Sequence, residues 1–186
     1  MLLKAKAVAI GGLFTALAVV SLILSGVINT SSMFFIVLAA FFIGTVMMVT
    51  NLVYGISAGT ATFLLGLMLA PKKMYCLTFS ICAAYVLAEE FFLEKKRSGN
   101  SVNPVLEWSV KAGAFIIPLV IEGAIEFYLF GLDALMPGLF SNLSLALKII
   151  LCLVIAIVMV LIIDRAYIVY SRYAMNMVKR MVNQDN

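Results

Sequence analysis

The chain has 186 residues, of which 65% are hydrophobic and only 12% are charged. Soluble domains carry about 25% charged residues and about 45–50% apolar ones, so this composition excludes a water-soluble fold of the same size. The net charge of +4 is a small excess that is typical of membrane-protein loops and does not indicate nucleic-acid binding. The sequence contains no His, which removes the commonest metal ligand and the usual general base near neutral pH.

A helix needs about 20 apolar residues to cross about 30 Å of hydrocarbon, because it rises 1.5 Å per residue. The chain is long enough for six such spans joined by short loops. We therefore expect an all-α integral membrane protein, with a six-helix transmembrane domain over residues 1–170 and a basic amphipathic cytoplasmic tail over 164–186. The six helices are expected at 8–28, 33–49, 52–70, 74–93, 105–131 and 144–163.

Polar or proline-containing segments separate these stretches. The first, which follows Lys4 and Lys6, is too long for a signal-peptide core and lacks a small-residue cleavage site, so we expect an uncleaved helix. Thr50-Asn51 is the least marked of the boundaries. Pro71 stops the third stretch, because proline cannot donate to the helix ladder. Two longer connections are expected at 94–101 and at 132–143.

The distribution of Lys and Arg predicts the orientation. With six spans, most of them fall on one side of the membrane, which by the positive-inside rule is the cytoplasm. Both termini are then cytoplasmic, and we expect a bacterial plasma-membrane protein. The residues on this side are Lys4, Lys6, Lys95, Lys96, Arg97, Arg165, Arg172, Lys179 and Arg180. Only Lys72, Lys73 and Lys148 lie near the outer side.

Glu122 and Glu126 form the sharpest constellation in the sequence. They are four residues apart in the fifth stretch, so both carboxylates lie on one helix face within an apolar segment. Charged groups in spans are costly and therefore indicate function. One interpretation is a substrate pocket for a cationic or amine-bearing solute. The other is partnership with Lys148, or with the lysines that follow Pro71, and both can hold in one polar network.

Other charged residues in the spans favour structural roles. Glu107 and Lys111 form an i,i+4 pair beside Trp108. Asp164 and Arg165, at the inner end of the sixth stretch, are interpreted as an interfacial charge pair. Glu89-Glu90 lies near the basic cluster at 95–97, and resembles the Glu-Glu-x-x-x-Arg motif of an intramembrane protease, but position 94 is Glu and no His completes that site. No nucleotide-binding loop or nucleophile elbow is present either, so we expect neither an enzyme nor a cofactor. The three cysteines have no CxxC spacing and predict neither disulfides nor a metal site.

Small residues spaced one turn apart predict close helix packing, because association in lipid lacks a hydrophobic driving force. Such a ladder in the third stretch (Gly55, Gly59, Gly66) is typical of packing within the bundle. The ladder in the first stretch lies near the cytoplasmic end, so docking to another membrane protein competes with internal packing there. We take Ala5, Ala9, Gly12 and Ala16 as the candidate docking residues.

The segment Lys4-Ala5-Lys6-Ala7-Val8-Ala9-Ile10-Gly11-Gly12 through Ala16 resembles the first helix of substrate-binding S components of energy-coupling factor (ECF) transporters. Phe42-Ile43-Gly44 and the segment from Tyr54 through Gly66 to Pro71 are similar to the glycine-spaced region of the same family. The resemblance implies six helices with both termini cytoplasmic. It also implies docking of the first helix to a transmembrane T component, which assembles with two ATPase subunits.

The resemblance further implies a solute pocket in the outer half, built by the last three helices. Its candidate residues are Glu122, Glu126, Lys148, Asn29, Tyr75, Tyr128 and Asp133. The function we expect is that of a membrane-embedded solute-binding subunit of an ATP-driven importer, which captures a small micronutrient, such as a vitamin. The alternative is a non-transporting membrane scaffold, whose small-residue faces and basic tail recruit envelope or cytoplasmic partners on anionic lipid.

Overall fold

The computed structural model describes residues 2–99, 101–130 and 145–183. The regular elements in this part of the chain are all helices, with no strand among them, which confirms the all-α class. Its elements are α1 (Leu2–Val27), the single 3₁₀ turn η1 (Asn29–Ser31), α2 (Ser32–Val49), α3 (Leu52–Leu69), α4 (Met74–Arg97), α5 (Pro104–Phe130) and α7 (Leu145–Asn183).

Five of the described helices are long and apolar enough to cross a membrane. These spans are Val8–Val27, Ser32–Val49, Leu52–Leu69, Met74–Arg97 and Pro104–Ile125. The sixth helix, α7, has 39 residues, which corresponds to about 58 Å and exceeds the thickness of the hydrocarbon core. The described helices are thus those of a multi-pass membrane protein.

Local signals set two helix starts. Asn51 precedes α3 and its side-chain oxygen accepts a hydrogen bond from the backbone N–H of Tyr54 at 3.1 Å, so a side-chain cap separates α2 from α3. Asn103 precedes α5, and its Oδ1 accepts from the Val105 N–H at 3.0 Å. Pro104 is the first residue of α5, where its missing N–H costs nothing.

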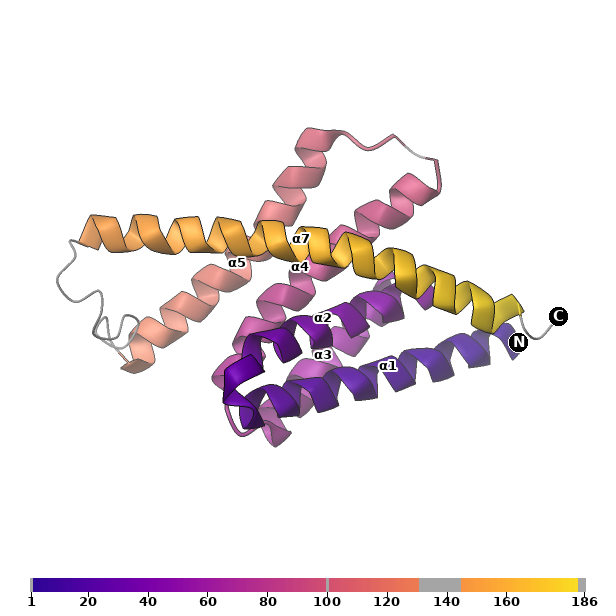
Figure 1. Cartoon of the computed structure of the whole chain (residues 1–186), viewed down its shortest axis with the longest axis horizontal. Coiled ribbons are helices and arrows are strands. Elements are labelled where there is room, and N and C mark those ends of the chain that lie inside the picture. The colour runs from indigo at the N-terminus through magenta and orange to yellow at the C-terminus, as the bar shows by residue number, and fades with distance from the viewer. Residues whose placement is uncertain (1, 100, 131–144, 184–186) are drawn as a thin grey trace.

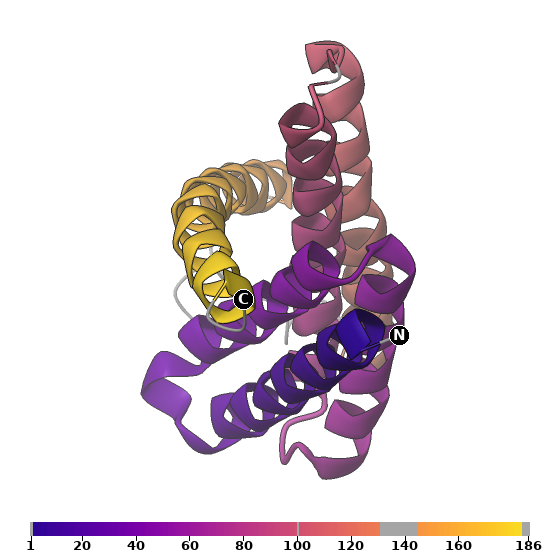
Figure 2. The ribbon, with the colours of Figure 1, turned by 90° about the vertical axis from the view of Figure 1, so that its right-hand side faces the viewer.

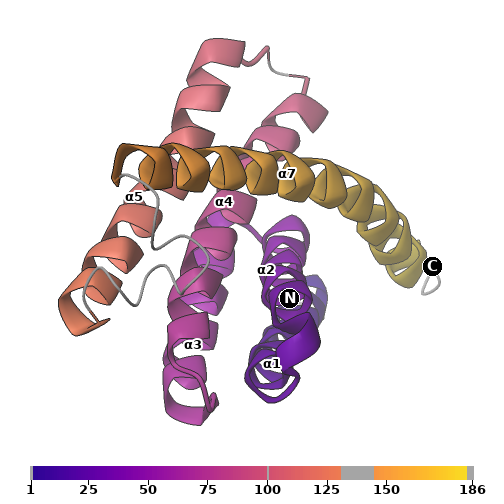
Figure 3. The ribbon, with the colours of Figure 1, turned by 60° about the vertical axis from the view of Figure 1, so that its left-hand side comes forward.

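Helices α1 to α4 form the centre of the molecule, with α2 between α1 and α4. α7 lies across α4 and α5 in two views (Figures 1 and 3) and packs against α2 with its later turns. The first turn of α1 and the last turn of α7 lie at the same end of the molecule (Figure 1), and both face the viewer in Figure 2.

Glycines allow the close helix contacts. A Cβ at Gly55 would lie 2.8 Å from the Cβ of Met47, and one at Gly66 would lie 2.4 Å from a terminal carbon of Leu22. The ladder of α3 therefore packs inside the bundle, as its spacing indicates. Gly44 of α2 serves in the same way for α7, because a Cβ there would lie 2.3 Å from the hydroxyl of Tyr167.

Candidate functional site

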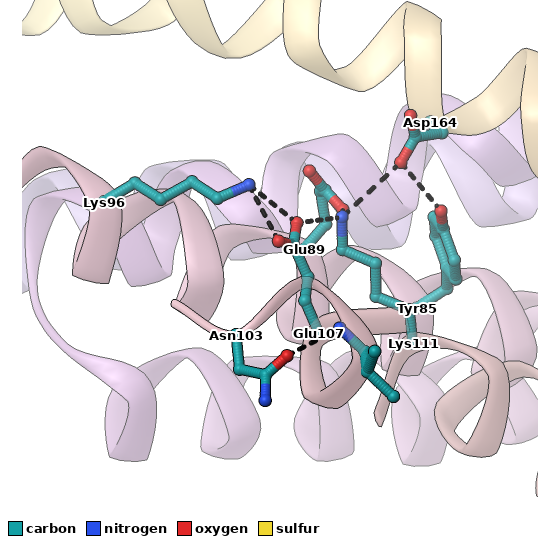
Figure 4. Close-up of polar contacts among 8 residues, drawn as sticks. Tyr85, Glu89, Lys96, Asn103, Glu107, Lys111 and Asp164 are labelled. Carbon is teal, nitrogen blue, oxygen red and sulfur yellow. Dashed lines mark hydrogen bonds and ion pairs between the residues drawn. The ribbon is translucent and has the colours of Figure 1, made fainter. Parts of the chain in front are cut away.

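A buried network of ionised side chains joins α4, α5 and α7 (Figure 4). Its centre is the ammonium group of Lys111, whose side chain is only 5% exposed. This group contacts Glu89 of α4, lies 2.8 Å from Oε1 of Glu107 and lies 3.8 Å from Oδ1 of Asp164 on α7. One lysine on α5 thus bridges carboxylates from three helices.

Two further side chains complete this network. The hydroxyl of Tyr85 donates a hydrogen bond of 2.9 Å to Oδ1 of Asp164, in the buried space between α4 and α7. At the other side, Lys96 lies 2.8 Å from both oxygens of Glu107, and its half-exposed side chain leads to the surface. The network therefore runs from the buried Tyr85 to the surface near the end of α4.

Helical spacing explains how the sequence builds these contacts. Tyr85 and Glu89 are four residues apart on α4, and Glu107 and Lys111 are four apart on α5, so each pair shares a helix face. The two faces meet because α4 and α5 pack along much of their length. Asp164 joins from α7, 79 residues after Tyr85 in the chain.

A second polar chain lies on the neighbouring face of α4. Glu90 is fully buried, accepts a hydrogen bond of 2.8 Å from the hydroxyl of Tyr167, and lies 2.6 Å from Nη1 of Arg97. The hydroxyl of Tyr170 lies 2.8 Å from that of Thr45 on α2. The hydrogen bond between Glu90 and Tyr167 thus joins α7 to α4, and the one between Thr45 and Tyr170 joins α7 to α2.

The network around Lys111 contains more acid than base. Three carboxylates, those of Glu89, Glu107 and Asp164, face the two ammonium groups of Lys111 and Lys96. The described residues contain no group of His, Cys, Asp and Glu side chains suited to a metal ion. The ion pairs of the network join α4, α5 and α7, so the arrangement is suited to holding these three helices together.

An apolar cavity of about 310 Å³ lies beside the network, among α4, α5 and α7. Lys111 and Tyr85 line it next to the network, and Trp108 and Phe115 supply aromatic walls. The remaining wall is aliphatic and includes Ile157 and other residues of α5 and α7. This cavity lies between α4, α5 and α7, and the described members of the predicted solute pocket, Glu122, Tyr75 and Tyr128, do not line it.

The structure does not bring the described members of the predicted solute pocket into one cavity. Glu122 is buried at the contact of α4 with α5, where its Oε1 accepts a hydrogen bond of 2.6 Å from Thr78. Tyr75 lies one turn before Thr78, and its hydroxyl is 3.5 Å from Nζ of Lys72. Tyr128 is 89% exposed on α5. Outside the described residues lie Asp133 and the side chains of Asn29, Glu126 and Lys148.

The candidate docking residues share an exposed face of α1. Ala5, Ala9, Gly12 and Ala16 are all exposed, and no atom lies within 4 Å of a Cβ built at Gly12. The opposite face, which includes Gly11, is buried near Val46 of α2. The bundle therefore leaves the predicted docking face of α1 uncovered in the part of the chain that the structure describes.

Sequence reasoning identified parts of the network but not the whole. The pair of Glu107 and Lys111 is confirmed. The expected closeness of Glu89 and Glu90 to the basic cluster at 95–97 is confirmed for Glu90, which pairs with Arg97, whereas Glu89 contacts Lys111 of α5. The interpretation of Asp164 as an interfacial partner of Arg165 is wrong, because Asp164 is buried and bonded to Tyr85 while Arg165 is exposed. The available signal was an acidic residue at the end of a long apolar stretch.

Comparisons with known proteins add no relative. No protein-family model matches the chain, and neither a curated protein nor a solved structure matches it. The functional interpretation therefore rests on the residues and on the geometry.

Proposed function

We propose that the chain is a membrane-embedded solute-binding subunit of an ATP-driven importer, similar to the S components of ECF transporters. In this role it captures a small, cationic or amine-bearing micronutrient outside the cell and docks to a transmembrane T component that works with two ATPases. The observation that carries the proposal is the uncovered small-residue face of α1, formed by Ala5, Ala9, Gly12 and Ala16. Small residues let two backbones approach closely, which suits docking of another transmembrane helix.

The docking step is tested by substituting Ala9→Leu together with Gly12→Leu. Both positions are exposed, so larger side chains leave the bundle intact and obstruct only a partner helix. We expect the double variant to lose co-purification with a T component in mild detergent. The matched control is Gly113→Leu with Ala124→Leu on α5, where Gly113 has open space and Ala124 is exposed. Co-purification of the α1 variant at wild-type yield would rule out docking through this face.

The solute step is tested at Glu122 and Glu126. If their carboxylates bind a cationic solute, Glu122→Gln with Glu126→Gln removes solute binding while the protein still folds. The matched control is Glu94→Gln, an exposed residue near the end of α4. Full uptake by the double variant would show that the solute binds elsewhere.

The burial of Glu122 favours a second candidate function. A solute carboxylate has to line a cavity that opens outward, whereas Glu122 is 9% exposed and bonded to Thr78 at a helix contact. In a non-transporting membrane scaffold, such a residue only holds α4 to α5. Purification from native membranes followed by mass spectrometry separates the two functions. An importer brings ATPase subunits and a bound solute with it, and a scaffold brings other partners and no solute.

A further inference from the structure

The cavity among α4, α5 and α7 is apolar in almost its whole lining. Its aliphatic walls include Ile116 of α5 and Ile157 and Leu161 of α7, each about half exposed on the outer surface of the bundle. Its aromatic walls are Tyr85, Trp108 and Phe115. A ligand that fills it has to be hydrocarbon over most of its length, because a polar group there would lose its hydrogen bonds to water.

The volume of the cavity is large enough for a chain of carbon atoms. It measures about 310 Å³, roughly twice the engineered 150 Å³ cavity of a soluble protein that stays dry and binds benzene. Its position also points to the bilayer as the source of the ligand. In Figure 1, α5 and α7 cross instead of running side by side. Ile116 of α5 and Ile157 and Leu161 of α7 line the cavity and are about half exposed, so the cavity is open to the surroundings of the bundle.

A molecule bound in the cavity would affect the neighbouring ion network. Lys111 and Tyr85 belong both to the cavity wall and to the network that contains Glu89 and Asp164. Water in the cavity would weaken these charge interactions, whereas hydrocarbon keeps the local dielectric constant low. An occupant of the cavity therefore influences how firmly Asp164 holds α7 to α4 and α5.

We propose that this cavity binds one acyl chain of a membrane lipid, which enters between α5 and α7 and fills the space beside the Lys111 network. The chain lies along α5 between the level of Trp108 and the level of Leu119, a length of about 16 Å at 1.5 Å per residue. Trp108, with its amphipathic ring, marks the end nearest the lipid headgroup. The lipid supplies packing that the two helices do not provide to each other. This proposal is independent of whether the chain docks to a T component.

Fluorescence quenching of Trp108 tests the proposal directly, because Trp108 is the single tryptophan of the chain and lines the cavity. The full chain is purified in detergent, and phosphatidylcholine with bromine atoms in the middle of one acyl chain is added. We expect quenching that saturates at low lipid content, on top of the slight linear quenching that free micellar lipid causes. Saturation requires a site, whereas random contact gives a linear response only.

Two variants fill the cavity from opposite walls. Ala112→Phe acts from α5 and Leu161→Phe from α7, and both residues line the cavity. We expect each to shift half-saturation to at least tenfold higher lipid content. The matched control is Ile117→Phe, which lies on α5, is 64% exposed and does not line the cavity, and it should behave like the wild type. Size-exclusion profiles and helical circular dichroism establish whether each variant is folded. One folded variant with a filled cavity is enough to test the proposal.

The other outcomes overturn the proposal. Linear quenching in the wild type, unchanged by the filled variants, means that the cavity holds no lipid chain. If brominated stearic acid saturates the quenching but brominated phosphatidylcholine does not, the occupant is a free amphiphile and not a membrane lipid.

Discussion

Lys111 is buried where three helices meet, and its single ammonium group interacts with carboxylates from all three. Its buried side chain contacts Glu89 and Glu107 and lies 3.8 Å from Asp164. Removing one partner of a buried ion pair is far more costly than removing the whole pair, because the remaining charge keeps its desolvation penalty. The stability of the α4–α5–α7 contact thus depends strongly on this one residue.

We predict that Lys111→Met lowers the free energy of unfolding by about 3–5 kcal/mol. The aliphatic part of the side chain is retained, so the loss reports the ammonium group. Denaturation of the purified protein by SDS measures the change. The control is Lys95→Met, because Lys95 is exposed and its Nζ lies 5.8 Å from the centre of the Phe91 ring, outside the network. An unfolding curve for Lys111→Met that overlays the wild type would mean that the network does not stabilise the fold.

Tyr85 gives a second prediction at this scale. Its hydroxyl donates to Oδ1 of Asp164 at 2.9 Å. Tyr85→Phe removes this hydrogen bond, and among the described residues the buried carboxylate then keeps the ammonium group of Lys111 at 3.8 Å. We expect a loss of about 1–3 kcal/mol in unfolding free energy. In the Asp164→Asn background the same change should have a much smaller effect, because the two side chains act as one unit. Equal losses in both backgrounds would show that Tyr85 and Asp164 are not coupled.

Single glycines determine how closely neighbouring helices pack. A Cβ at Gly55 of α3 would meet the Cβ of Met47 at 2.8 Å, an atom that cannot swing away. We therefore predict that Gly55→Ala destabilises the protein, although alanine favours a helix over glycine by about 1 kcal/mol. Gly113→Ala on α5, where nothing lies within 4 Å, should be neutral or stabilising. Thermal unfolding of the two variants in detergent compares them, and a stabilised Gly55→Ala would contradict the packing of α3 on α2.

At the scale of the helix, the sequence predicts what local forces determine. Long apolar stretches establish the helices, and the four-residue spacing of Glu107 and Lys111 establishes their ion pair. The position of α7 along its neighbours is not encoded locally. It depends on the fit of Tyr167 beside Gly44 and Phe41. The partner of Glu122 is not encoded locally either. Helical periodicity predicts which face of α5 carries Glu122, but it does not predict that Thr78 of α4 lies opposite that face.

At the scale of the whole molecule, the start of α1 and the end of α7 lie at the same end of the bundle (Figure 1). From the positive-inside rule we predict that this end faces the cytoplasm.

Cysteine labelling in intact cells tests this orientation, with the native cysteines replaced by serine. We expect a membrane-impermeant maleimide to label Lys72→Cys, which lies in the exposed turn between α3 and α4. Lys4→Cys and Asn183→Cys should be labelled only after the cells are opened. Labelling of one end but not the other in intact cells would require an odd number of membrane passes.

The buried acids of α4 also have a consequence for how the protein is made. Glu90 enters the membrane with its helix, yet Tyr167, which donates to it, lies 77 residues later in the chain. At a synthesis rate of about 5–20 residues per second, that interval lasts about 4–15 s. During this time α4 carries an incompletely satisfied carboxylate in the lipid or at the insertion machinery. A chain that ends before Tyr167 therefore lacks the hydroxyl that donates to Glu90, and this carboxylate then depends on its pair with Arg97 of the same helix.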